Sequence, residues 1–353
     1  MDNRKRILVA PLNWGLGHAT RCIPIIRGLL DHDLEPIIAS DGDALALLKK
    51  EFPQLSFVEF PSYNIQYAEK AKYFKLKMLW DTPKILKAIA AENRQTQQLV
   101  ERLGICGIIS DNRLGVSCKK VPCVFITHQL NVLTGTTTWF SSKVHQRIIE
   151  KFDECWVPDV KDEPNLSGRL GHLTRDKPAI KYIGALSRLN TLDEEKIYDL
   201  MVLISGPEPQ RSMLEAKVLK QLSGYAGEVI FIRGKIEAEQ EITRKDRILI
   251  YNYMNTEQLE KAFNQSELVL SRSGYTTVLD LAKLGKRAFF IPTPGQYEQE
   301  YLAQRLEKQR LVPYCKQEDF NIEMLERASD FKGLSAVDSE LNLNSFFGLF
   351  QGK

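Results

Sequence analysis

The sequence lacks any apolar run long enough to cross a membrane. A membrane-spanning helix needs about 20 mostly apolar residues, and none of the apolar stretches in these 353 residues approaches that length. The first residues, MDNRKRILVAPLNWG, combine a basic start with a short apolar stretch that Pro11 and Asn13 interrupt, which favours a first strand over a signal peptide. We therefore expect a cytoplasmic protein.

The net charge is also small, and the sequence lacks closely paired cysteines. A formal charge of +3, with 43% hydrophobic and 26% charged residues, is typical of a globular protein and gives no reason to expect a nucleic-acid partner. The six cysteines form no CxxC pair and mostly lie in apolar segments, so we expect free, buried thiols. Cys118, Cys123 and His128 have loose metal-like spacing, but Cys123 falls inside a strand pattern, and we expect no zinc site.

The sequence does contain two successive series of strand patterns that alternate with helical patterns. Strand patterns occupy 6–11, 36–40, 56–60, 107–111, 123–127, 154–158 and 180–184, and again 200–205, 228–233, 247–252, 268–273 and 288–292. This alternation predicts an α/β protein with two doubly wound, Rossmann-like domains facing a cleft. We expect an N-terminal domain over 1–187, a C-terminal domain over 188–335 and a tail, 336–353, that packs back on the first domain.

The second domain contains a helix start suited to a phosphate group. Ser273 and Gly274 follow a strand and precede a helical pattern, and the unpaired backbone N–H groups at a helix start attract anions. Within that helix, Thr276, Thr277 and Asp280 share one face. The Asp280 carboxylate is therefore placed to accept hydrogen bonds from ribose hydroxyls, the alternative being a solvated helix residue.

Other loops at strand ends in this domain carry more candidates for the same ligand. An arginine can bind a diphosphate through two hydrogen bonds, and neighbouring Glu and Gln side chains can hold sugar hydroxyls, although acidic residues are also common at ordinary helix starts. The further donor-side candidates are Ser205, Gly206, Arg211, Arg233, Met254, Gln296, Glu298 and Gln299.

The order strand, SGxxTxxD, helix, strand, Pro, loop and Glu-Gln resembles the donor-binding half of GT-B glycosyltransferases, above all of the family 28 type. The resemblance covers roughly residues 198–315 and matches Arg272 to an arginine that precedes the Ser-Gly pair. It implies that Asp280 stands where the family has a ribose-binding glutamate. It also implies that Gln299 and Glu300, or Glu298 and Gln299, bind the donor sugar.

The resemblance departs from the family pattern in the first loop of this domain. Residues 207–210, Pro-Glu-Pro-Gln, replace the glycine-rich loop that the family has there. The phosphate contacts that this loop makes in the family are therefore not carried over to this chain.

In the first domain, the stretch PLNWGLGHATRCIP places His18 where a helix opens after the first strand. A histidine can take a proton from a sugar hydroxyl near neutral pH, although a packing or capping role is also common. This stretch resembles inverting GT-B transferases, which have a Gly-His pair at the same strand-to-helix turn, with the His facing the acceptor. Many of those enzymes have Pro at the position of Arg21. Asp111 ends a strand and is expected to orient His18, with His128 as the alternative base.

Three further residues and one segment complete the acceptor side. We expect acceptor contacts from Gly17, Arg113 and Gln129, as well as from Arg21 and His128. The stretch 69–87 interleaves Lys with apolar and aromatic residues, which favours either contact with the inner face of a membrane or the solvated face of a core helix.

Together these features predict an inverting, metal-independent glycosyltransferase without a cofactor. Its expected donor is UDP-GlcNAc or a similar UDP-sugar, and its acceptor a hydroxyl of a cell-envelope glycan or lipid-linked sugar. The Asp-x-Asp strings at 31–33 and 41–43 resemble a metal-binding motif but lie far from the donor residues. The alternatives are a nucleotide-sugar epimerase, a non-catalytic binder or an NAD-dependent dehydrogenase, whose glycine fingerprint is broken by Thr20.

Overall fold

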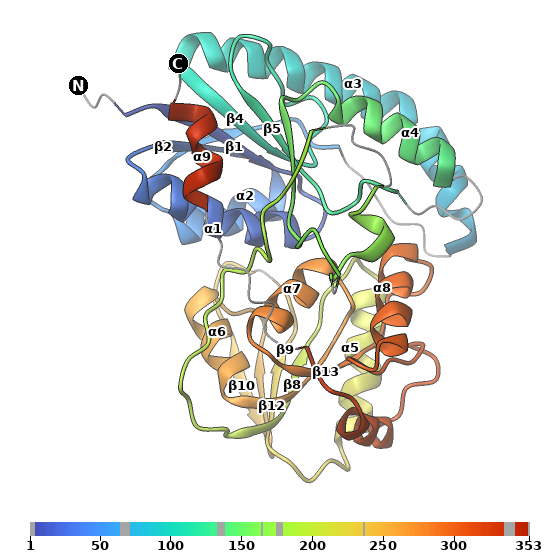
Figure 1. Cartoon of the computed structure of the whole chain (residues 1–353). Helices are drawn as coiled ribbons and strands as arrows, with labels where there is room; N and C mark the ends of the chain where they lie inside the picture. Colours follow the sequence, from blue (N-terminus) through green and yellow to red (C-terminus); the bar gives the residue numbers. More distant parts are fainter. Residues whose placement is uncertain are drawn as a thin grey trace. The chain divides into compact units, whose positions relative to one another are not determined.

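Contacts divide the described part of the chain into two units (Figure 1). The computed structural model describes residues 4–63, 71–132, 138–163, 165–173, 179–235, 237–334 and 343–351. Of the described residues, the first unit contains 4–63, those from Tyr73 to Leu186 and the C-terminal helix, and the second contains 71–72 and those from Ser187 to residue 334. Each unit contains one sheet.

The first unit contains a parallel sheet in the strand order β3-β2-β1-β4-β5-β6-β7. Its strands are β1 (Arg6–Pro11), β2 (Glu35–Ser40), β3 (Ser56–Glu59), β4 (Ile105–Asp111), β5 (Cys123–Ile126), β6 (Glu154–Val157) and β7 (Ile180–Tyr182). The central strands β1, β4 and β5 are almost entirely buried. Their near-continuous apolar sequences suit a parallel sheet that helices cover on both faces.

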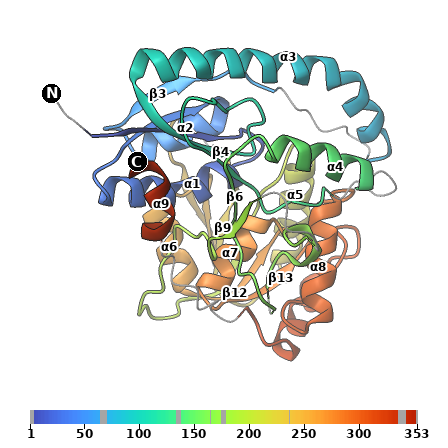
Figure 2. The same ribbon diagram turned by 45° about the horizontal axis from the view of Figure 1, so that its top comes forward.

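Helices cover both faces of this sheet (Figures 1 and 2). The helices α1 (Gly17–Asp31) and α2 (Gly42–Glu51) lie on one face, and α3 (Ala71–Leu103) and α4 (Thr138–Ile149) on the other. The core on the α3 side joins Leu99 of α3 and Ile149 of α4 to Leu8 and Phe125 of the sheet. The carboxyl ends of β1 and β4 lie side by side, because Pro11 pairs with Asp111.

The C-terminal helix α9 (Leu343–Gln351) packs against the rest of the first unit. Phe347 and Phe350 are buried against the indole of Trp156 at ring-centroid distances of 6.3 and 6.4 Å. The Lys5 ammonium donates a hydrogen bond to the carbonyl oxygen of Gln351 (2.6 Å) and so ties the helix end to the segment before β1.

The second unit contains a mostly parallel sheet in the order β10-β11-β9-β8-β12-β13. Its strands are β8 (Tyr198–Leu203), β9 (Val229–Ile232), β10 (Ile242–Lys245), β11 (Ile248–Tyr251), β12 (Ser266–Ser271) and β13 (Arg287–Phe290). The helix α5 (Gln210–Leu222) covers one face, and α6 (Thr256–Asn264) and α7 (Tyr275–Lys283) cover the other. The helix α8 (Tyr297–Lys308) and a 3₁₀ segment, η3 (Ile322–Asp330), follow β13.

The predicted α/β fold class is confirmed, and every predicted strand is present with slightly different ends. The strand that the sequence did not indicate is β10, which pairs antiparallel with β11 at the sheet edge. Its sequence, ITRK, is exposed at all four positions and therefore has no buried face that would give an alternating pattern.

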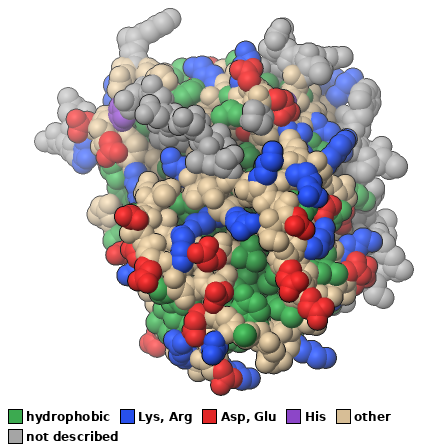
Figure 3. All heavy atoms as spheres, turned by 60° about the horizontal axis from the view of Figure 1, so that its bottom comes forward, with side chains coloured by type: hydrophobic (Ala, Val, Ile, Leu, Met, Phe, Trp, Pro, Cys, Tyr) green, Lys and Arg blue, Asp and Glu red, His purple; other side chains and the backbone are tan. Residues whose placement is uncertain are grey.

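Two features of the surface bear on possible partners. On the face drawn in Figure 3, side chains of both charge signs are interspersed among hydrophobic ones, in keeping with the small net charge. Within the described residues, no helix is long and apolar enough to cross a bilayer. In the expected membrane-contact stretch, residues 69–70 and the side chains of 71–83 and 85 lie outside the described set; Lys84, Leu86 and Lys87 are exposed.

Candidate active site

His18 and Asp111 meet at the carboxyl edge of the first sheet. His18 is the second residue of α1 and Asp111 the last residue of β4, and these elements adjoin because α1 follows β1, the neighbour of β4. The ring Nδ1 of His18 lies 2.8 Å from Asp111 Oδ1. The Asp111 side chain is fully buried, whereas 13% of the His18 side chain is exposed. The pair thus has the geometry of a histidine oriented by a carboxylate.

Arg21 binds the same carboxylate from the next turn of α1. Its Nε donates to Asp111 Oδ2 (2.5 Å), and its Nη2 donates to Oδ1. The same Nη2 lies 2.8 Å from His18 Nδ1, and Nη1 lies 3.0 Å from Nδ1 of His128. The residue at which the sequence departs from the family pattern therefore contacts all three of the other polar side chains in this cluster.

The charges of the cluster set the protonation of His18 and Asp111. Burial raises the pKa of the Asp111 carboxyl, but the positive charge of Arg21, with His18, outweighs this and holds it at about 2. Burial and then Arg21 lower the pKa of His18 below its usual range, against the opposite effect of Asp111. His18 is therefore neutral at neutral pH and can accept a proton.

Hydrogen-bond directions distinguish His18 from His128. A guanidinium can only donate, so the Nδ1 of His128 that faces Arg21 accepts, and a neutral ring then carries its proton on Nε2. A ring with that tautomer is a donor and not a base at Nε2. Arg21 also approaches Nδ1 of His18, but there Asp111 Oδ1 lies at the same distance of 2.8 Å and can hold a proton on Nδ1, which leaves Nε2 free. We infer the tautomers from these partners, and they favour His18 as the base.

His145 of α4 lies close to this cluster and was not indicated by the sequence. Its Nε2 is buried without a hydrogen-bond partner in the described structure, and its ring packs edge-on against Phe125 at 5.8 Å. Burial, and then the proximity of His128, lowers the pKa of His145 to about 4. His145 therefore adds no charge to the cluster at neutral pH.

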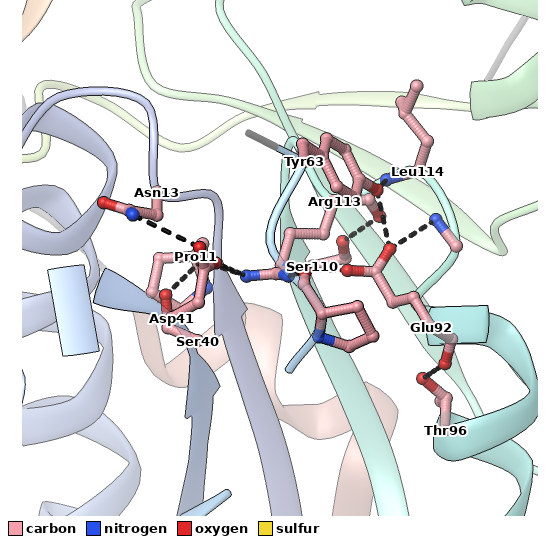
Figure 4. A network of polar contacts seen from close by, with 12 residues as sticks. Pro11, Asn13, Ser40, Asp41, Tyr63, Glu92, Thr96, Ser110, Arg113 and Leu114 are labelled. Atoms are coloured by element: carbon pink, nitrogen blue, oxygen red, sulfur yellow. Dashed lines mark hydrogen bonds and ion pairs between the residues drawn. The ribbon is translucent and has the colours of Figure 1, made fainter. Parts of the chain in front are cut away.

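Arg113, expected on the acceptor side, belongs instead to an internal network (Figure 4). Its fully buried guanidinium donates to Glu92 Oε1 (2.5 Å), Asp41 Oδ1 (2.7 Å) and the carbonyl oxygen of Pro61 (2.7 Å). Tyr63 donates its hydroxyl proton to the other oxygen of Glu92 (2.7 Å). These contacts use the guanidinium inside the protein, so they give Arg113 and Asp41 structural roles and do not support acceptor contact.

The remaining acceptor-side candidates lie beside the two histidines in the chain. The carbonyl oxygen of Gly17 accepts a hydrogen bond from the Thr20 hydroxyl (3.1 Å), and the Gln129 amide donates to the Thr127 hydroxyl (3.0 Å). Both contacts fix the backbone next to His18 and His128.

In the second unit, α7 begins directly after the carboxyl end of β12, with Gly274 as its N-cap residue. The N-cap makes no side-chain cap hydrogen bond, and a Cβ built on Gly274 would have a single neighbour, Gln299 Nε2, at 4.0 Å. The buried hydroxyl of Ser273 donates to the carbonyl oxygen of Gln299 (2.8 Å), so this side chain ties α7 to α8. The helix start is thus open on the side of Gly274.

The Gln299 side chain is oriented toward this helix start. Its amide oxygen accepts a hydrogen bond from the backbone N–H of Thr293 (2.8 Å). Because a backbone N–H can only donate, the amide oxygen lies on the Thr293 side, which leaves the Nε2 donor on the Gly274 side. Gln299 therefore presents a fixed donor near the first turn of α7.

Among the described residues, no anionic side chain pairs with the buried cation of Arg272. Its guanidinium donates to the carbonyl oxygens of Ile291 (3.0 Å) and Pro292 (3.1 Å) and to Gln317 Oε1 (2.7 Å). Among the described residues, no carboxylate forms an ion pair with it, and burial lowers its pKa to about 9. The cost of burying this charge is therefore not offset by any carboxylate in the described protein.

In the described part of the chain, two buried polar atoms lack hydrogen-bond partners in this region, one of them in Arg272 itself. In the described structure, neither the Arg272 Nε nor the Thr293 hydroxyl has a hydrogen-bond partner. A Cβ built on Gly206 would lie 3.6 Å from the Thr293 Oγ1 and 4.0 Å from the Arg272 Nε. Gly206 is exposed and has φ +107°, a conformation that favours glycine. The strand ends of β8, β12 and β13 thus bring unmatched donors together.

The two other arginines that we expected at a diphosphate are paired within the protein. Arg211 donates to Glu208 Oε1 (2.6 Å) and to Glu215 Oε2 (2.6 Å). Arg233 Nε lies 2.7 Å from Glu215 Oε1. These carboxylates balance both charges, so the expectation of phosphate contact is not supported for Arg211, which is buried, and is weakened for Arg233, which is half-buried.

Asp280 is not a solvated helix residue, because it is buried and its carboxylate is held in place. The Ser187 hydroxyl donates to Asp280 Oδ1 (2.6 Å), and the described structure holds no other hydrogen bond to this carboxylate. Burial raises its pKa to about 6, against the lowering effect of Ser187 and Arg188. Thr276 and Thr277 are half-buried on the same helix.

The other donor-side candidates differ in how much of their side chain is accessible to a ligand. Met254, after β11, is almost completely buried, so it presents little surface to a base. Gln296 is the N-cap residue of α8, and Glu298 is half-buried in its first turn. Ser205 is half-buried two residues after the end of β8.

Sequence reasoning missed Thr293 and Ser187 as well as His145. Thr293 is a single hydroxyl in a loop, and no spacing distinguishes it from other threonines. Ser187 is the last residue of the first predicted domain, 1–187, so no local pattern indicates its contact with α7.

Comparison with known proteins connects both units to one enzyme family. Residues 210–330 match the glycosyltransferase family 28 C-terminal domain. Two relatives, from Haemophilus ducreyi and Glaesserella parasuis, are both named UDP-N-acetylglucosamine–N-acetylmuramyl-(pentapeptide) pyrophosphoryl-undecaprenol N-acetylglucosamine transferase. The first is 23% identical over 57% of this chain and 54% of its own length, and the second 22% identical over 92% and 88%.

Solved structures share the fold at low sequence identity. Spinosyn forosaminyltransferase SpnP has a TM-score of 0.64 and 12% identity, and the match covers 99% of this chain and 100% of that one. MurG of Acinetobacter baumannii has a TM-score of 0.57 and 12% identity over 98% and 99% of the two chains. SsfS6 of Streptomyces sp. SF2575, complexed with thymidine diphosphate, has a TM-score of 0.60 and 12% identity over 99% and 94%. The second unit thus contains the glycosyltransferase family 28 C-terminal domain, and the chain has the GT-B fold and is similar along most of its length to a nucleotide-sugar glycosyltransferase.

Proposed function

We propose that the chain transfers N-acetylglucosamine or a similar sugar from a UDP-linked donor to a hydroxyl of a cell-envelope glycan or lipid-linked acceptor, with inversion at the sugar carbon. The relatives from H. ducreyi and G. parasuis support this choice, because their names give a UDP-N-acetylglucosamine donor and a lipid-linked acceptor.

The unpaired charge of Arg272 carries the donor half of the proposal. A diphosphate at the start of α7 supplies negative charge close to a buried guanidinium that no described carboxylate neutralises. The open N-cap at Gly274 and the fixed Nε2 donor of Gln299 lie at the same helix start. Arg272 acts here through its charge, because most of its donors are bound to protein oxygens.

The rest of the donor fits the neighbouring polar groups. Asp280 Oδ2, the oxygen that does not contact Ser187, accepts a hydrogen bond from a ribose hydroxyl. Gln299 and Glu298 form hydrogen bonds with hydroxyls of the sugar. When the bond between the sugar carbon and the diphosphate breaks, the helix amides and the charge of Arg272 stabilise the departing diphosphate. No metal ion is required for this step.

The base in the proposed mechanism is His18. The acceptor hydroxyl attacks the anomeric carbon while Nε2 of His18 takes its proton, and Asp111 holds the Nδ1 proton and stabilises the imidazolium that forms. The displacement is a single step, so it inverts the configuration at the sugar carbon.

Binding and transfer measurements test the proposal in sequence. We expect UDP and UDP-N-acetylglucosamine to raise the melting temperature of the full chain more than TDP, GDP or NAD⁺ at equal concentration. Labelled UDP-N-acetylglucosamine should then transfer its sugar to a lipid extract from a cell envelope. Conversion of the sugar without an acceptor would favour the epimerase, binding without turnover would favour a non-catalytic protein, and stabilisation by NAD⁺ alone would favour a dehydrogenase.

A further inference from the structure

We propose that Arg21 is a positioning residue that controls how readily His18 takes up a proton, by sharing the Asp111 carboxylate with it. The inference rests on the proposed function, in which His18 accepts the proton of the acceptor hydroxyl. It assigns to Arg21 a role in the basicity of His18 instead of direct contact with an acceptor.

The first argument is charge. A carboxylate beside a histidine stabilises the imidazolium with its full negative charge when it has no other partner. Here Arg21 holds both oxygens of Asp111 through two hydrogen bonds, in a geometry that lets the two opposite charges cancel. His18 therefore faces a nearly neutral ion pair, and its proton affinity is lower than in an isolated His–Asp pair.

The second argument is competition at one ring nitrogen. Asp111 Oδ1 and Arg21 Nη2 both lie 2.8 Å from Nδ1 of His18. The carboxylate requires a proton on Nδ1, which leaves Nε2 free to act as the base. The guanidinium requires the lone pair of Nδ1, which moves the proton to Nε2 and removes the base. Arg21 thus influences both the proton affinity of His18 and the fraction of rings with the productive tautomer.

The other titratable groups around this cluster do not replace Arg21. On α1, the Cys22 Sγ lies 3.7 Å from Asp111 Oδ2, and burial raises the pKa of this thiol well above its usual value, so it is neutral. After β5, His128 receives a hydrogen bond from Arg21 itself. On α4, His145 is neutral at neutral pH, as described above. The charge that offsets Asp111 is therefore that of Arg21.

Histidine titration by NMR tests this proposal without any substrate. The chain has five histidines, so a protein labelled in its histidine rings gives few signals, and the signal that disappears in His18→Gln is that of His18. We expect the His18 titration midpoint to lie below its usual value in the wild type and to rise by about one pH unit in Arg21→Met, where Asp111 regains its full charge. Asp111→Asn should lower the midpoint instead.

Arg21→Lys serves as the conservative variant and as a safeguard against misfolding. A lysine retains the positive charge but cannot hold both oxygens of Asp111, so its midpoint should lie between those of the wild type and Arg21→Met. A midpoint in Arg21→Met equal to or below that of the wild type would overturn the proposal. If Arg21→Met does not fold, the proposal would be overturned by a His18 titration midpoint in Arg21→Lys that is equal to or below that of the wild type.

The titration separates this inference from the proposed function. If His18 titrates as expected but no donor or acceptor is turned over, the role of Arg21 stands and the transfer reaction fails. If transfer occurs, the acid limb of the kcat/KM profile should move to higher pH in Arg21→Met, in parallel with the NMR midpoint. A limb that stays in place would contradict the role of Arg21 in catalysis.

Discussion

The hydroxyl of Ser187 donates a hydrogen bond to the carboxylate of Asp280, with 2.6 Å between Oγ and Oδ1. The same hydroxyl accepts a hydrogen bond from the backbone N–H of Leu189 (3.1 Å). Ser187, at the boundary between the two predicted domains, is thereby tied to the helix proposed to bind the nucleotide, which places this boundary next to the proposed donor site.

The buried carboxyl of Asp280 makes donor binding sensitive to pH. Because burial raises its pKa to about 6, the group is ionised above that value and protonated below it. The charged form accepts a ribose hydroxyl more strongly, so the Kd for UDP should increase as the pH falls from 7.5 to 5. In Asp280→Asn, binding should be about tenfold weaker at pH 7.5 and should lose this dependence. Calorimetric titration with UDP at several pH values measures both, and an equal pH dependence in the variant would exclude Asp280 from the site.

Ser187→Ala should shift the midpoint of the pH dependence of UDP binding to higher pH. The hydrogen bond from Ser187 favours the ionised carboxylate, so its loss raises the pKa of Asp280 further. The midpoint of the UDP-binding profile should shift to higher pH while tight binding persists at alkaline pH. Ser223→Ala, at an exposed serine of the same unit, is the matched control and should leave the midpoint unchanged. A midpoint that does not move in Ser187→Ala would show that the hydrogen bond has no part in donor binding.

His18→Ala should slow transfer and leave donor binding intact. Removal of a general base costs about 10²- to 10⁴-fold in turnover, whereas His18 has no role in the proposed donor contacts. His128→Ala should have a smaller effect, because its inferred tautomer makes it a donor. Turnover and UDP affinity measured on both variants decide the assignment, and full activity of His18→Ala with an inactive His128→Ala would reverse it.

Arg113→Met should destabilise the fold without a specific effect on the chemistry. The substitution leaves Glu92 and Asp41 without their partner, and removing one member of a buried ion pair costs about 3–5 kcal/mol. Chemical denaturation followed by circular dichroism measures the loss. Lys120→Ala, which breaks the exposed pair with Glu101, is the control and should change stability little. A fully stable Arg113→Met with weakened acceptor binding would restore the acceptor role.

Part of this site follows from the sequence because topology brings it together. His18 and Asp111 end or follow strands that a parallel sheet places side by side, so their contact is foreseeable from two strand patterns. The open N-terminus of α7 likewise follows from a strand, a Ser-Gly pair and a helical period.

The partners of the arginines were harder to foresee. Arg211 pairs with Glu208 and Glu215 at helical spacings of three and four residues, which the sequence contains but which compete with a ligand role. Arg113 instead meets Asp41 and Glu92 from distant parts of the chain, and no local pattern indicates that. That Arg272 has no carboxylate partner among the described residues could be found only once the structure had placed the partners of the other arginines.

The open N-terminus of α7 is most directly tested by a side chain that covers it. Gly274 has φ −66° and only Gln299 Nε2, at 4.0 Å, near its Cβ position, so Gly274→Val should fold while it blocks the first amides of the helix. Gly224→Ala, at an exposed glycine with no neighbour around its Cβ position, is the matched control. Calorimetry should show that the wild type and Gly224→Ala bind UDP much more tightly than UMP, and that Gly274→Val loses tenfold or more in UDP affinity. A folded Gly274→Val that binds UDP as tightly as the wild type would contradict the proposed donor site.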